Sequence, residues 1–135
     1  MQSSWYHLIM TTSTDQSALL LFAHGSSDPG WAAPFVKLKV AIQAREPDKI
    51  VALAFLERME PSFDDAVTAL QKQAVKQITV APIFLAIGGH MRNDLPKLIE
   101  ETQARTGISF RVLPTLGEAD ALIAAIADWV LSSAK

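Results

Sequence analysis

The sequence contains no cysteine among its 135 residues. This absence excludes disulfides, zinc–thiolate sites, iron–sulfur clusters and cysteine nucleophiles from the chain. A metal ion bound here must therefore be held by nitrogen and oxygen donors. Histidine is also scarce, with three residues in the whole sequence, so the positions of the histidines restrict where such a site can lie.

The chain also lacks an excess of positive charge and a long apolar run. Twelve Lys and Arg residues stand against 14 Asp and Glu, and the net charge is −2, whereas nucleic-acid binding usually needs a basic face. No apolar run approaches the roughly 20 residues that span a membrane. The N-terminus lacks the basic and apolar regions of a secretory signal. We therefore expect a cytoplasmic protein whose partners include neither nucleic acid nor a membrane.

Half of the residues are hydrophobic, and they gather into four short apolar runs that alternate with four amphipathic segments. Strict alternation of this kind predicts a single α/β domain over residues 18–135, with a four-stranded parallel sheet and helices on both faces. Residues 1–17 are expected to form a mobile N-terminal extension. A sheet this small should leave exposed apolar surface that a dimer would cover. The predicted strands span 18–23, 50–56, 77–85 and 108–113, and the predicted helices span 31–45, 61–74, 91–105 and 119–131.

Two prolines and one glycine interrupt these predicted elements. Pro82 has no N–H to donate, so we expect strand pairing to weaken there. Pro96 falls near the first turns of the third helix and is expected to delay its start. Gly107 is expected to end the same helix.

Three polar side chains follow three of the apolar runs. His24 follows the first run, Glu57 the second and His90 the third, and both intervals are 33 residues long. Ligands of parallel α/β sheets bind beyond the carboxyl ends of the strands, so the three residues are expected at one edge of the sheet. Two imidazoles and a carboxylate that converge there would form a divalent-metal site.

Each of these residues also has a purely structural interpretation. A lone histidine such as His24 more often bonds a loop backbone, and His90 follows two glycines that suit a turn. Glu57 has Arg58 and Lys37 as possible ion-pair partners. The metal-site interpretation depends on the three residues together.

An anion site is a further interpretation of the loop Gly25–Ser27, which precedes a predicted helix N-terminus. It would make the chain a phosphate- or nucleotide-binding module. The sequence has neither GxGxxG nor GxxxxGK[ST]. Phosphohistidine chemistry at His24 is less favoured, because no arginine stands just before it.

Three motifs in order resemble the short form of the sirohydrochlorin cobaltochelatases, the CbiX-like members of the class II tetrapyrrole chelatases. The resemblance covers about residues 18–131. The motifs are Ala23-His24-Gly25-Ser26, then Ala54-Phe55-Leu56-Glu57 with Pro61, then Pro82-Ile83-Phe84-Leu85 with Gly88-Gly89-His90 and Asp94-Leu95-Pro96.

The resemblance implies a flavodoxin-like half-chelatase domain. It implies ATP-independent insertion of a divalent metal into sirohydrochlorin or a related tetrapyrrole, in cobalamin or sirohaem biosynthesis. Co²⁺ is favoured and Ni²⁺ or Fe²⁺ is an alternative, with no organic cofactor and no iron–sulfur cluster. Long-form relatives fuse two such halves, so a single half implies a homodimer with its active site in the subunit cleft.

The family's metal positions carry over onto His24, Glu57 and His90, for which we expect both metal-binding and catalytic roles. The histidines would hold the ion, and Glu57 would act as a third ligand or as a proton acceptor. A non-catalytic metal carrier that uses the same histidines is the alternative function. The residues expected to bind the tetrapyrrole are Ser26, Arg58, Gly88, Gly89 and Arg92, with the arginines gripping its carboxylates.

Overall fold

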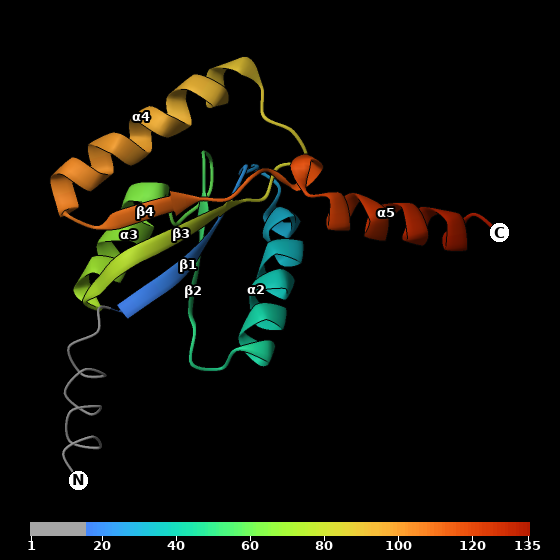
Figure 1. Cartoon of the computed structure of the whole chain (residues 1–135), viewed down its shortest axis with the longest axis horizontal. Coiled ribbons are helices and arrows are strands. Elements are labelled where there is room, and N and C mark those ends of the chain that lie inside the picture. The colour runs from blue at the N-terminus through green and yellow to red at the C-terminus, as the bar shows by residue number, and fades with distance from the viewer. Residues whose placement is uncertain (1–15) are drawn as a thin grey trace, which may run out of the picture.

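The computed structural model describes residues 16–135 (Figure 1). The predicted extension therefore lies outside the described residues, apart from its last two, which belong to the first strand. The elements in chain order are β1 (Gln16–Ala23), η1 (Pro29–Ala32), α2 (Ala33–Arg45), β2 (Ile50–Phe55), α3 (Phe63–Lys72), β3 (Val75–Pro82), α4 (Gly89–Thr106), β4 (Ser109–Val112), η2 (Leu116–Glu118) and α5 (Asp120–Ser133).

The four strands form one parallel sheet in the order β2-β1-β3-β4. This confirms the predicted α/β class and the four-stranded parallel sheet. The chain turns to one side of β1 for β2 and to the other side for β3 and β4. The carboxyl ends of β1 and β3 therefore flank the point where the winding reverses, which is where ligands bind in such sheets.

Helices lie on both faces of the sheet. Phe22 of β1 packs edge-on against Phe63 of α3, with 5.3 Å between ring centroids. Ala23, the next residue of β1, pairs with Phe55 of β2. The ring of Phe55 packs against that of Phe35 in α2, with 6.1 Å between ring centroids. Because consecutive strand residues point to opposite faces, α2 and α3 lie on opposite sides, as Figure 1 shows.

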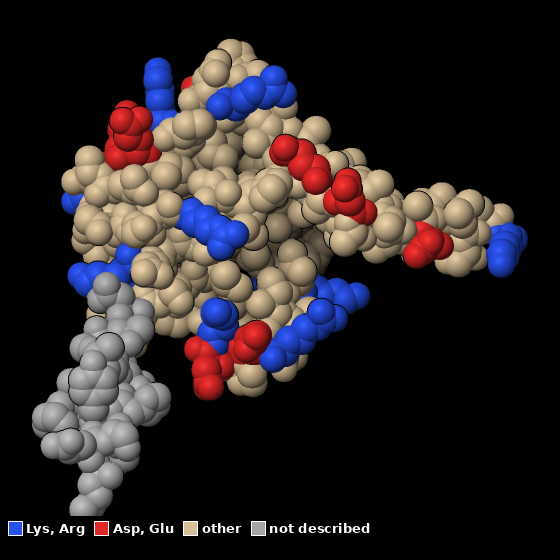
Figure 2. All heavy atoms as spheres, in the orientation of Figure 1, with Lys and Arg blue, Asp and Glu red and all other residues tan. Residues whose placement is uncertain are grey.

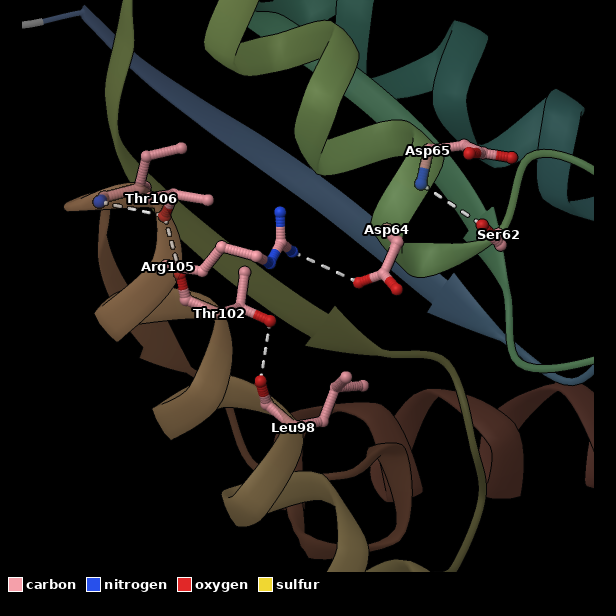
Figure 3. A network of polar contacts seen from close by, with 8 residues as sticks. Ser62, Asp64, Asp65, Leu98, Thr102, Arg105 and Thr106 are labelled. Atoms are coloured by element: carbon pink, nitrogen blue, oxygen red, sulfur yellow. Dashed lines mark hydrogen bonds and ion pairs between the residues drawn. The ribbon is translucent and has the colours of Figure 1, made fainter.

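The main core lies between the sheet and the pair α3 and α4. Helix α3 buries the apolar face that the sequence predicts, and its N-terminus is capped by Ser62, whose hydroxyl accepts from the Asp65 amide at 3.1 Å (Figure 3). An ion pair of 3.3 Å between Arg105 and Asp64 joins the end of α4 to the start of α3. The buried residues of this core are Ala18, Leu20, Phe22, Ala54, Phe63, Ala66, Val67, Leu70, Val75, Ile78, Val80, Phe84, Leu95, Ile99 and Ile108.

The other face is poorly covered. Helix α2 lies over β2 and β1 but buries none of its residues. Helix α5 extends away from the body of the domain, and most of its contacts are with the short η2 helix that precedes it. The predicted exposed apolar surface is therefore present, and it lies mainly on these two helices.

Pro82, Pro96 and Gly107, which the sequence analysis expects to interrupt their elements, affect those elements differently. Strand β3 ends at Pro82, where pairing with β1 stops. The prediction that Pro96 delays the third helix was wrong, because α4 begins at Gly89 and continues through it. Burial of Leu95 and Ile99 on either side offsets the hydrogen bond that Pro96 cannot make. Gly107 ends α4 in a left-handed conformation with φ of 76°, as predicted.

Within residues 16–135, none of the helices combines the length and the apolar character that crossing a membrane requires.

Candidate metal-binding site

His24 and Glu57 lie side by side at the carboxyl edge of the sheet. The Nδ1 atom of His24 is 3.7 Å from Oε1 of Glu57, and the two side chains are 51% and 43% exposed. His24 follows β1 directly, and Glu57 lies two residues beyond the end of the neighbouring strand β2. The pair is thus an accessible nitrogen and oxygen donor set, of the kind that first-row divalent ions bind.

Backbone packing holds these two residues together. The Leu56 amide donates to the Ala23 carbonyl at 2.8 Å, so the pairing of β1 with β2 continues past the end of the strands. A Cβ atom at position 25 would overlap the carbonyl oxygen of Glu57. Only glycine permits this approach.

The loop that carries His24 is fixed by a tryptophan. The indole Nε1 of Trp31, in η1, donates a 2.7 Å hydrogen bond to the backbone carbonyl of His24. Asp28 caps the same turn by accepting from the Gly30 amide at 2.9 Å, and the Ser26 hydroxyl accepts from the Asp28 amide at 3.1 Å. The side-chain oxygens of Ser26 and Asp28 therefore make hydrogen bonds within the turn. The hydrogen bond of Trp31 is a contact that sequence reasoning missed.

The imidazole of His24 rests against an aromatic ring from the opposite loop. Its ring centroid lies 4.5 Å from that of Phe84, which is buried just beyond β3. This contact restricts the plane of the imidazole, so that its nitrogens stay at the open edge of the sheet beside Glu57.

His90 lies in the first turn of α4, after the Gly88 N-cap, and is exposed. Across the described part of the chain, no three His, Cys, Asp or Glu side chains come close enough to hold one metal ion. The structure thus brings His24 and Glu57 together and leaves His90 outside that pair. The loop before it is sterically open, because a Cβ at Gly88 or Gly89 would meet nothing within 4 Å.

The two candidate arginines have different surroundings. Arg58 is exposed and adopts a left-handed backbone conformation with φ of 64°, in the loop after β2. The guanidinium of Arg92 lies 3.4 Å from the Ile87 carbonyl, and Arg92 also lines a cavity of about 630 Å³. The other residues that line this cavity are Leu85, Ala86, Ile87, Thr115, Gly117 and Glu118.

The segment after β4 is a part of this edge that sequence reasoning missed. The Leu116 and Gly117 amides donate to the carbonyls of Phe84 and Leu85, at 3.0 and 2.8 Å. A Cβ at Gly117 would overlap the Leu85 carbonyl oxygen, so this glycine permits a second close approach of two loops. The sequence offers one signal for it, a glycine in the short segment between the last predicted strand and the last predicted helix.

Known proteins similar to this chain are tetrapyrrole chelatases and their relatives. A family model described as CbiX matches residues 18–133. The crystal structure of a CbiX protein of cobalamin (vitamin B12) biosynthesis from Marinobacter aquaeolei VT8 is 39% identical, with a TM-score of 0.76, over 87% of this chain and 96% of that one.

Two further matches cover smaller shares of the relatives. The sirohydrochlorin cobaltochelatase of Methanocaldococcus jannaschii is 38% identical over 82 residues, which are 61% of this chain and 57% of that protein. SirB from Bacillus subtilis, solved with Fe³⁺, has a TM-score of 0.70 at 22% identity and shares the fold. The match covers 84% of this chain and 45% of SirB, so this chain spans less than half of that protein.

Proposed function

Because the chain belongs to the CbiX family, we propose that it inserts a divalent metal ion into sirohydrochlorin or a related tetrapyrrole without ATP, with Co²⁺ as the favoured ion. The observation that carries the proposal is the exposed pair of His24 and Glu57 at the carboxyl edge of the sheet. The name of the Methanocaldococcus jannaschii relative, a sirohydrochlorin cobaltochelatase, supports the choice of substrate and ion. The product would serve cobalamin or sirohaem biosynthesis.

Metal insertion requires the ion to lose water, two pyrrole N–H protons to leave, and metal–nitrogen bonds to form in the ring. We assign the capture of the ion to the imidazole of His24 and the carboxylate of Glu57, with His90, in the first turn of α4, as a third ligand. Two donors, or three with His90, hold an ion weakly and leave its other coordination positions to water. Such a site can release its ion to four ring nitrogens, which a closed tetrahedral site would resist.

The same residues can remove the pyrrole protons. A neutral imidazole that has released the ion has a free lone pair and can accept one proton, and Glu57 can accept the other. Both side chains are about half exposed, so each proton can pass from them to solvent. The open edge also leaves room for a flat ring to approach the ion from outside.

We assign substrate recognition to the loops around the pair. Arg92 lines the cavity of about 630 Å³ together with Leu85 and Ile87, and this combination offers an apolar wall and one guanidinium to a ring that carries carboxylates. Arg58 would grip a second carboxylate. The open backbone at Gly88 and Gly89, and the loop of Ser26, complete the proposed surface.

We also propose that the active chain is a homodimer with its site in the subunit cleft. A single half-domain presents only one edge to a large flat substrate. The exposed apolar side chains on α2 and α5 support an interface with another protein surface.

An anaerobic optical assay tests the proposal. Sirohydrochlorin is mixed with Co²⁺, Ni²⁺ or Fe²⁺ in turn, with and without the protein, and the shift to the metallated spectrum is timed. We expect a protein-dependent rate that is lost in His24→Ala and Glu57→Gln and kept in Glu60→Gln, a matched change three residues further along the same loop.

A non-catalytic metal carrier is the second candidate, and the accessibility of the His24–Glu57 pair to a free ion favours it. If insertion of all three metals proceeds at the uncatalysed rate while the protein still binds Co²⁺, the carrier function is favoured over the chelatase function.

A further inference from the structure

Strand β2 is an edge strand whose outer side is open to an added strand. The sheet order places β2 and β4 at the two edges. Strand β4 has four residues and carries Arg111, and short or charged edge strands resist further pairing. Strand β2 has six residues, IVALAF, with neither a charged residue nor a proline. The β2 edge therefore has none of these sequence features that discourage pairing.

Alternate residues of β2 turn their backbone groups toward this open side. The Phe55 amide donates away from β1, to the Pro61 carbonyl at 2.9 Å. Because the alternation has a period of two, the N–H and C=O of Val51 and Leu53 point the same way. Among residues 16–135, none of the hydrogen bonds involves these outward groups. Val51 is 6% exposed, and the backbone amide of a residue buried this far normally has a partner.

A groove of about 670 Å³ runs along the same edge, between the two helices that cover opposite faces of the sheet. Residues of β2 form its floor. Val36 of α2 lies on one wall, and Ala69 and Leu70 of α3 lie on the other. A strand in this groove would be covered by a helix on each face, and strands buried on both faces are apolar along nearly their whole length.

Residues 5–10 of this chain, which lie outside the described residues, have that composition. Their sequence is WYHLIM, with His7 as the one residue that is neither aliphatic nor aromatic-apolar. Aromatic and β-branched residues favour strands. Residues 1–14 contain no Asp, Glu, Lys or Arg, so the segment would bring no carboxylate, ammonium or guanidinium group into the groove.

The polar segment 11–15 is long enough to bring residues 5–10 to the groove. Gln16 begins β1 beside the turn that leads into β2, and the two line a hollow of about 490 Å³. Reaching the free side of β2 from β1 means crossing two strand spacings, about 10 Å, whereas five extended residues span about 17 Å. Charged groups gather over this turn, which includes Arg45 and Lys49, at the lower end of the molecule (Figure 2). Such a solvated surface suits the polar sequence TTSTD of residues 11–15.

We propose that residues 5–10 add to the free edge of β2 as a fifth, antiparallel strand within the same chain. A segment that reaches the free edge at the amino end of β2 and ends near its carboxyl end runs opposite to β2. The outward groups of Val51 and Leu53 would gain partners there, while Pro61 already pairs with Phe55 at the carboxyl end. Because Glu57 follows β2 by two residues, the added strand would also support the edge that carries one candidate metal ligand.

Amide hydrogen exchange of the metal-free full chain, followed by NMR, tests the added strand without any chelatase assay. We expect the Val51 and Leu53 amides to exchange at least about 100-fold more slowly than free peptide amides. Leu8→Asp places a carboxylate in the groove and should speed their exchange by about tenfold or more. Thr12→Asp adds the same charge to the polar segment and should leave the exchange within about twofold.

The amides of Ala52 and Ala54 turn toward β1 and provide the control for folding. They should stay protected in wild type and in both variants. Wild-type Val51 and Leu53 amides that exchange at free-peptide rates would overturn the proposal. Equal protection of these two amides in wild type and Leu8→Asp would overturn it as well.

A spin label distinguishes pairing within the chain from pairing between copies. The sequence has no cysteine, so His7→Cys creates a single attachment site for a nitroxide. In an isotope-labelled chain the nitroxide should broaden the Leu53 amide signal far more than that of Arg111, at the opposite edge of the sheet. Mixing an isotope-labelled chain with a separate spin-labelled chain should leave Leu53 sharp. Equal broadening at the two edges, or broadening of Leu53 only through the mixed copies, would overturn the proposal.

Discussion

The backbone of Gly25 lies directly against the carbonyl oxygen of Glu57, so that a single added methyl group would overlap that oxygen. Gly25 follows one candidate ligand, and Glu57 is the other. The spacing of the His24 and Glu57 side chains, 3.7 Å between Nδ1 and Oε1, is therefore set by a backbone contact between two loops. We expect changes at this contact to alter metal binding even though no ligand is removed.

Gly25→Ala should lower stability and metal affinity together. The new methyl group must push the two loops apart, and such overpacking costs about 1–3 kcal/mol. Chemical denaturation and Co²⁺ titration measure the two effects. Gly30→Ala is the matched control, because its Cβ would meet the nearest atom, Asp28 Oδ1, at an ordinary 3.5 Å. A Gly25→Ala protein that binds Co²⁺ like wild type would show that the loop contact does not set the ligand spacing.

Trp31→Phe should weaken metal binding without removing any group that touches the metal. It keeps an aromatic ring but loses the 2.7 Å hydrogen bond from the indole to the His24 carbonyl, an interaction of about 1 kcal/mol. We expect a several-fold rise in the Co²⁺ dissociation constant and a similar small loss of stability. Trp129→Phe, which changes an exposed indole far along α5, should leave Co²⁺ affinity unchanged. Equal Co²⁺ affinities of the two variants would show that Trp31 does not position His24.

Metal binding should weaken as the pH falls from about 8 to about 5, because the ligands bind the ion only in their deprotonated form. Isothermal titration with Co²⁺ across this range measures the change. His24→Ala should bind more weakly and should depend less on pH, since one competing site for protons is gone. An identical pH dependence in wild type and His24→Ala would exclude His24 as a ligand.

Arg92→Ala should mainly raise the KM for the tetrapyrrole. A charge-assisted contact with a carboxylate contributes about 1.5–3 kcal/mol, which corresponds to a rise of roughly tenfold or more in KM with little change in kcat. Steady-state kinetics at saturating Co²⁺ separates the two parameters. Lys97→Ala removes a cation from the same helix outside the cavity and should leave KM unchanged. An unchanged KM in Arg92→Ala would show that Arg92 does not bind the carboxylates of the tetrapyrrole.

The elements that sequence reasoning predicted well are those with local causes. The four strands and four main helices appear in the predicted order, because apolar periodicity and strand length are properties of short segments. The buried stripe of α3 and the stop at Gly107 follow from residue spacing and backbone conformation alone. Pro96 was misjudged because its cost depends on how strongly Leu95 and Ile99 are packed, and that packing involves distant strands.

The candidate site also combines contacts that the sequence predicts with contacts that it does not. Sequence reasoning placed His24 and Glu57 at one edge, because both follow strands of a parallel sheet. The contacts of Trp31 and Gly117 were not predicted from the sequence. Their partners are the His24 and Leu85 carbonyls, which are backbone atoms that any residue could supply. The structure leaves His90 outside this pair among the described residues, and its role as a third ligand stays a prediction, to be tested by His90→Ala in the optical assay.

The sequence by itself determined the strand and helix pattern, the parallel sheet and the absence of thiolate chemistry, because each depends on composition or on neighbours along the chain. Only the tertiary structure decided that His24 pairs with Glu57, that Gly25 sets their spacing, and that α5 leaves the domain instead of covering β3 and β4. These outcomes depend on which backbone atoms and which polar faces meet after folding, and residues far apart in the chain supply them.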